Sequence, residues 1–112
     1  MPTKIELPNG VSEEGLRELV EQGYTTEVVC VDDPHYTGQN FTGKWNIRAV
    51  SPDGDSEMVL VTQRKTKEPR DIKTIVGVIN LLIGMGYDAV SLPMRAGGRR
   101  PNRKRGANPP LD

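Results

Sequence analysis

The side chains best suited to chemistry in this chain are the basic ones near its C-terminus. Residues 95–112 contain six of them against a single acid, Asp112. They are Arg95, Arg99, Arg100, Arg103, Lys104 and Arg105. Each can neutralise one nucleic-acid phosphate and release its counterions, which gives an affinity that depends on salt and not on base sequence. Residues 1–94 hold nine basic and fourteen acidic side chains, so the sequence predicts an acidic body with a cationic tail.

The composition of this tail also predicts its conformation. Glycine, proline and asparagine separate the basic residues, and Leu111 is the only large aliphatic residue after Met94. Burial cannot offset the ordering entropy of such a segment, so residues 95–112 are expected to be disordered in the free protein. A tail of this kind could instead improve solubility or contact the acidic body. Membrane-surface binding is disfavoured, because the tail has no aromatic residue and no lipidation motif.

A second group of basic residues precedes the second predicted helix. It comprises Lys65, Lys67, Arg70 and Lys73, next to Arg64. These side chains could extend a phosphate-binding surface onto the folded body. An ordinary solvated loop is the alternative, since surface charge is common.

Catalytic and metal-binding chemistry is poorly represented in the chain. His35 and Cys30 are its only histidine and cysteine, so no zinc ligand set exists. Asp32 and Asp33 lack the spacing of a calcium-binding loop. Cys30 stands in a β-branched run, where a buried thiol is usually inert. No glycine cluster leads from a strand into a helix, as a phosphate-binding loop requires. We therefore expect no enzyme activity, no metal and no cofactor.

The length and hydropathy of the chain limit its class further. Its 112 residues suit one domain, and no apolar run approaches the roughly 20 residues that span a bilayer. The first residues do not resemble a signal peptide, and a single cysteine is typical of a reducing compartment. These features predict a cytoplasmic protein.

Two helices are predicted from capping residues and apolar periodicity. The first should run from Ser12, a good N-cap, to Gly23, which can adopt the αL conformation. The second should begin near Asp71 and end near Gly84. Its predicted buried face consists of Ile72, Ile75, Val76, Ile79, Leu82 and Ile83.

Three antiparallel strands are predicted at 25–31, 44–50 and 57–64, with Trp45, Ile47 and Ala49 facing one way. Pro34 should end the first strand and leave residues 32–43 as a polar loop. Residues 51–55 form a turn sequence, and residues 88–92 could add a short final strand. The economical fold for a compact domain over residues 1–94 is α+β. Its three-stranded antiparallel sheet carries both helices on one face and leaves the other face in water.

This order of elements resembles that of the double-stranded-RNA-binding domain. Asp33-Pro34-His35-Tyr36, with Phe41, stands where that family has a Pro-x-His-type loop that enters the RNA minor groove. The basic residues Arg64 to Lys73 stand near the family's phosphate-binding lysines, although Ile72-Lys73-Thr74-Ile75 replaces the consecutive lysines. The resemblance covers residues 12–86 and implies that His35 contacts RNA. Topology alone says little about function.

The sequence thus predicts a non-catalytic nucleic-acid-binding accessory protein that uses its tail for phosphate contacts. The alternative is a small protein-interaction module or regulator that acts through its acidic body or an exposed sheet edge. RNA and DNA, single and double strands, and the oligomeric state all stay open.

Overall fold

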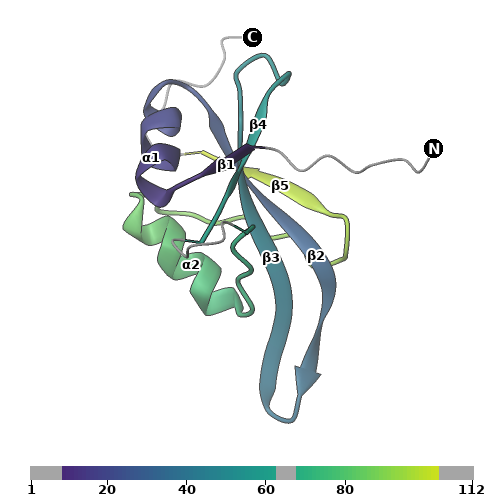
Figure 1. Cartoon of the computed structure of the whole chain (residues 1–112). Helices are drawn as coiled ribbons and strands as arrows, with labels where there is room; N and C mark the ends of the chain where they lie inside the picture. Colours follow the sequence, from purple (N-terminus) through teal and green to yellow (C-terminus); the bar gives the residue numbers. More distant parts are fainter. Residues whose placement is uncertain (1–8, 63–67, 104–112) are drawn as a thin grey trace, which may run out of the picture.

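The computed structural model describes residues 9–62 and 68–103. It contains the helices α1 (Glu13–Glu21) and α2 (Ile75–Gly84) and the strands β1 (Asn9–Val11), β2 (Thr25–Thr37), β3 (Asn40–Val50), β4 (Glu57–Leu60) and β5 (Arg99–Asn102). The strands form one mixed sheet in the order β1-β4-β3-β2-β5. Both helices lie on the same side of this sheet (Figure 1). The predicted α+β class is confirmed.

The predicted three-stranded antiparallel sheet is wrong, because the sheet has five strands and is mixed. The additional strands are its two edges. β1 runs parallel to β4, whereas β5 runs antiparallel to β2. β1 has only three residues and β5 reads Arg-Arg-Pro-Asn, so neither carries the apolar alternation by which strands are found in a sequence.

The predicted disorder from Arg95 onward is wrong for residues 95–103, and a domain boundary after residue 94 would divide the sheet. β5 pairs with β2 from Thr26↔Asn102 to Val29↔Arg99. The prediction considered only burial of aliphatic side chains, which this segment lacks. Main-chain hydrogen bonds and the buried side chain of Asn102 order the segment instead. The expectation for residues 104–112 lies outside the described residues.

The predicted polar loop at 32–43 is instead a long hairpin that projects from the body (Figure 1). β2 continues past Pro34 to Thr37 and pairs with β3 as far as Thr37↔Asn40. Register shifts between Cys30 and His35 accommodate Pro34, which takes no place in the ladder. Gly38 supplies the positive φ of the turn (64°).

The core lies between the sheet and the helices. As predicted, Trp45, Ile47 and Ala49 share one face of β3 and are fully buried. The rest of this cluster includes Leu16 of α1, Val28 and Cys30 of β2, Leu60 of β4, and Val78 and Leu82 of α2. The indole Nε1 of Trp45 donates to the Pro93 carbonyl oxygen at 2.9 Å, which fastens the segment before β5 to the sheet.

The first helix agrees with its prediction. The Ser12 hydroxyl caps α1 by accepting a hydrogen bond from the Gly15 amide at 3.0 Å. Gly23 has φ 103° and ends the helix as expected. The turn at 51–55 is also confirmed, with φ 79° at Gly54.

The second helix differs from its prediction in start and in orientation. Thr74, not Asp71, is the N-cap, and Asp71 instead accepts a hydrogen bond from Asn46. Ile72 precedes the helix and forms a β-bridge with Trp45. Val78 and Leu82 are fully buried and Leu81 is nearly so, whereas Val76 and Ile83 are exposed. A helix apolar on nearly every side gives no unique stripe, so the sequence could not orient it.

Residues 88–92 form no strand. They run beside β5, where the main chain of Ser91 is bound by the Asn102 side chain. Within the described residues, neither α1 nor α2 is long and apolar enough to span a membrane.

Candidate nucleic-acid interface

Arg99 and Arg100 stand on β5, with Arg95 before it and Arg103 directly after it. β5 forms one edge of the sheet (Figure 1). The strand is introduced by a tight turn in which Gly97 has φ 86°. The Gly97 amide donates to the Cys30 carbonyl at 2.8 Å, and the Cys30 amide donates to the Gly98 carbonyl at 2.9 Å. The amide of Ala96 donates to the Asp33 carboxylate at 2.6 Å. These contacts fix the start of β5 against β2.

The other end of β5 is fixed by Asn102, whose side chain is 4% exposed. Its carbonyl oxygen accepts from the Ser91 amide at 2.6 Å. Its amide nitrogen donates to the carbonyls of Ser91 at 3.0 Å and Arg100 at 3.2 Å. One side chain therefore joins β5 to the segment that precedes it.

Arg99 is an ion-pair partner within the fold rather than a free cation. Its guanidinium lies on the sheet face away from the helices, 2.7 Å from Glu27 and 2.8 Å from Glu57. Glu57 also pairs with Arg48 at 3.2 Å. The hydrogen bond from Arg99, supported by Arg48, lowers the pKa of Glu57, and burial opposes this in part. The same Glu57 contact raises the pKa of Arg99.

The other described arginines of this region are exposed. Arg95, Arg100 and Arg103 have no ion pair within residues 9–62 and 68–103. Arg95 and Arg100 line a shallow hollow of about 380 Å³, whose other walls are Leu92, Pro93, Met94, Gly98 and Arg99. Met94 is 44% exposed and supplies an apolar surface between the cations. The structure therefore brings cationic and apolar groups together at this edge.

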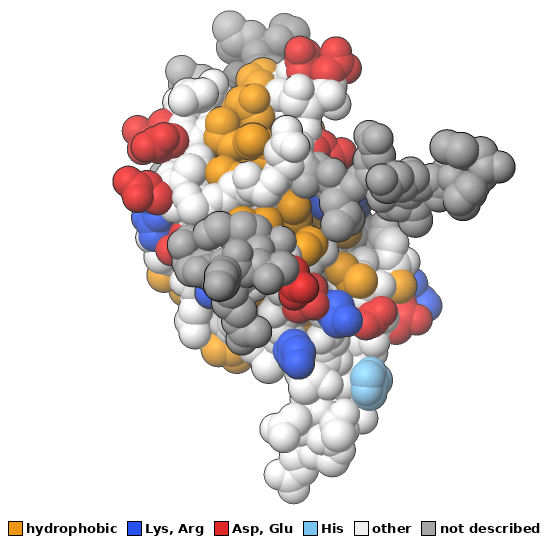
Figure 2. Space-filling view, viewed as in Figure 1, with side chains coloured by type: hydrophobic (Ala, Val, Ile, Leu, Met, Phe, Trp, Pro, Cys, Tyr) orange, Lys and Arg blue, Asp and Glu red, His pale blue; other side chains and the backbone are white. Residues whose placement is uncertain are grey.

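Of the second predicted cluster, the structure describes Arg70 and Lys73. Arg70 is held by Glu13 of α1 at 3.1 Å. Lys73 is exposed just before α2 and has no ion pair with a described residue. His35 pairs with Thr42 in the β2–β3 hairpin. The projecting part of this hairpin is largely uncharged (Figure 2). The Nδ1 atom of His35 is 3.3 Å from the Asp33 carbonyl oxygen.

Four of the predicted contact residues, Lys65, Lys67, Lys104 and Arg105, lie outside the described residues. Three important residues were missed from the sequence: Met94, Glu27 and Glu57. The glutamates could have been suspected, because each stands in a strand at a position that faces away from the core. For Met94 the sequence contains no comparable indication.

Cys30, whose main chain bonds to residues 97 and 98, is buried beside the start of β5. Burial raises the pKa of the Cys30 thiol, and the carboxylates of Asp33 and Asp32 add to the effect. The thiol donates to the Asp32 carbonyl oxygen at 3.1 Å. Among the described residues no three His, Cys, Asp or Glu side chains stand close enough to hold a metal ion.

The fold and this edge define a small α+β protein with exposed arginines on an edge strand. No protein-family model, curated protein or solved structure matches the chain.

Proposed function

We propose that the protein binds nucleic acid without catalysis, through phosphate contacts from the β5 edge and the basic residues that follow it. The observation that carries this proposal is the distribution of unpaired cations. Among the described lysines and arginines that precede residue 95, all except Lys73 form an ion pair. The three others without an ion pair are Arg95, Arg100 and Arg103, all on or beside β5.

A phosphate backbone suits this edge chemically. A guanidinium offers several donors in a planar fork that matches phosphate oxygens. In the sequence Lys104 and Arg105 follow Arg103 directly, which lengthens the row of positive charge. Met94 offers an apolar contact for an unstacked base beside Arg95 and Arg100.

The same edge is poorly suited to binding a protein strand. In an antiparallel ladder, successive residues direct their main-chain N–H groups alternately toward and away from the neighbouring strand. Because Cys30 of β2 bonds to residues 97 and 98, this alternation directs the main-chain nitrogen of Pro101 away from β2, to the outer edge of the sheet. Proline has no N–H to offer there, and the flanking arginines would repel a cationic strand. This favours phosphate binding over strand addition at β5.

Fluorescence anisotropy with labelled single- and double-stranded DNA and RNA, between about 50 and 200 mM salt, tests the proposal. The variant is Arg95→Gln with Arg100→Gln. Arg17→Gln with Lys44→Gln is the control, because it removes the same charge elsewhere on the body. If two phosphate contacts are lost, the slope of log K against log[salt] should become shallower by roughly 1.4 for single strands and 1.8 for duplexes. Affinity at about 0.1 M salt should fall roughly 25- to 60-fold.

Two results would contradict the proposal: no binding by the intact chain at low salt, or an equal loss in both double variants. The second would indicate a response to net charge rather than to this edge. A chain ending at Arg103 measures the share of Lys104 and Arg105. Ending the chain at residue 94 would be uninformative, since it would remove β5.

A further inference from the structure

The outward side of α2 is an apolar surface that no other described part of the chain covers. Val76 is 63% exposed and Ile83 is 58% exposed. Seven residues apart, they stand on the same side of the helix two turns from each other, with partly buried Ile79 between them. The opposite side of the helix, with Val78 and Leu82, fills the core. Exposed large aliphatic side chains grouped on one element mark an interaction surface.

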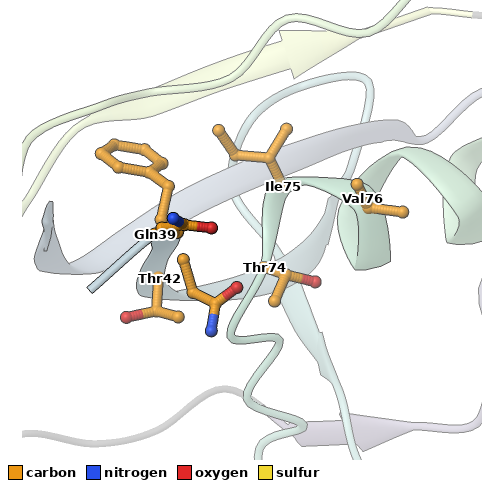
Figure 3. A pocket seen from close by; sticks show the side chains of 7 residues that line it. Gln39, Thr42, Thr74, Ile75 and Val76 are labelled. Atoms are coloured by element: carbon orange, nitrogen blue, oxygen red, sulfur yellow. The ribbon is translucent and has the colours of Figure 1, made fainter. Parts of the chain in front are cut away.

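A shallow hollow lies at each end of this ridge. The first, of about 490 Å³, separates the β2–β3 hairpin from the start of α2. Figure 3 shows Gln39 and Thr42 on the hairpin side and Thr74, Ile75 and Val76 on the helix side. The second, of about 380 Å³, is lined by Ile79, Ile83 and residues 87–90. The helix thus presents a ridge with a partly apolar recess at either end.

The charge of this surface indicates which partner suits it. α2 reads Ile-Val-Gly-Val-Ile-Asn-Leu-Leu-Ile-Gly and has no charged side chain. Among the described residues that line the two hollows, Asp88 alone is charged. A cationic or anionic partner would find few opposite charges here. A second copy of the same surface brings no like charges together along the ridge and offers a matching ridge and recesses.

We propose that two copies of the chain pair through the outer side of α2, with the two helices antiparallel about a two-fold axis. An axis between Ile79 and Asn80 places Val76 of one copy against Ile83 of the other, twice. Each Ile83 then points toward the recess at the start of the partner helix. The exposed Asn80 side chains meet near the axis, where an amide can donate to and accept from its symmetry mate.

The size of the surface sets the expected strength of this dimer. A ten-residue helix is about 15 Å long, so α2 alone falls short of the roughly 800 Å² that each partner buries in a stable complex. The walls of the two hollows extend the contact, and the polar Asn80 pair fixes its register more than it adds affinity. A weak, reversible dimer is therefore expected. Within the described ranges, the residues that line the Arg95–Arg100 hollow differ from those that line this surface, so the two proposals can be tested separately.

Sedimentation velocity of the full chain over a range of concentrations tests the proposal. Val76→Glu and Ile83→Lys should each raise the dissociation constant roughly 30-fold or more, because each places an unpaired charge in the apolar contact twice per dimer. Val31→Glu is the matched control, since Val31 is an exposed aliphatic side chain (39%) on β2, away from α2. Circular dichroism and thermal unfolding verify that each variant folds.

The register predicts a rescue that simple loss of folding could not produce. Mixing the Val76→Glu chain with the Ile83→Lys chain creates one Glu–Lys pair and leaves one Val76–Ile83 contact. The mixture should therefore form heterodimers where neither variant alone dimerises. The proposal is overturned if the wild-type chain stays monomeric up to about 1 mM. It is also overturned if Val31→Glu dissociates the dimer equally, or if the mixture stays monomeric.

Discussion

Replacement of Asn102 by alanine should cost the fold far more than its place in a basic, glycine- and proline-rich segment suggests. The side chain is 4% exposed and makes three hydrogen bonds, two of them with the main chain of Ser91. Alanine would leave the Ser91 amide and carbonyl without these partners. Each buried unsatisfied group costs about 1–3 kcal/mol, and partial access to water reduces the sum. We therefore expect a loss of about 2–4 kcal/mol in the free energy of unfolding.

Urea unfolding followed by circular dichroism measures this loss as a change in midpoint at constant slope. Asn40→Ala is the control, because Asn40 is exposed at the hairpin turn and should lose less than about 0.5 kcal/mol. A loss at Asn102 no larger than at Asn40 would refute the reasoning, and β5 would then be a loosely attached tail. Hydrogen exchange of the Ser91 amide gives a local check, since its protection should fall in the variant.

Two further predictions concern titratable groups. Arg99 lowers the pKa of Glu57 in the folded protein, so the ionised carboxylate stabilises the fold. This contribution is fully present above about pH 4.3, the usual pKa of glutamate, and it is lost as the pH falls through the lower pKa of the folded state. The stability of wild type relative to Glu57→Gln should therefore shrink on acidification through this window, and a constant difference in urea midpoint would contradict the ion network. The Cys30 thiol is 1% exposed with a raised pKa, so a thiol reagent at neutral pH should label it only at the rate of unfolding or local opening. Labelling as fast as in urea would contradict its burial.

Local signals in the sequence predicted the elements that depend on local chemistry. The Ser12 cap, the Gly23 terminus and the alternation around Trp45 are all found where expected, because each rule acts over a few neighbouring residues. The α+β class followed from them. The prediction that Pro34 ends the strand is wrong, because a proline is tolerated where the ladder shifts register.

The remaining errors arise where long-range contacts decide the structure. The choice between Asp71 and Thr74 as N-cap depended on Asn46, 25 residues away from Asp71 in sequence, which binds the Asp71 carboxylate. The orientation of α2 followed from the same shift, because Ile72 left the helix to pair with Trp45. Of the candidate site, the composition indicated the basic residues but not their partners.

The strand at residues 99–102 also explains why composition alone gave an incomplete description of the basic segment. Side chains alternate along a strand, so the neighbours Arg99 and Arg100 point to opposite faces of the sheet. Arg99 lies over Glu27 and Glu57 and joins β5 to the acidic body. Arg100 stands opposite Val28 on the other face. It is exposed, and β5 is an edge strand of the sheet.

A disordered tail would offer both side chains equally to a phosphate. An ordered edge divides them, because Arg99 stabilises the strand while Arg100, with Arg95 and Arg103, stays available. Arg99→Gln should therefore weaken the fold, whereas Arg100→Gln should weaken phosphate binding alone.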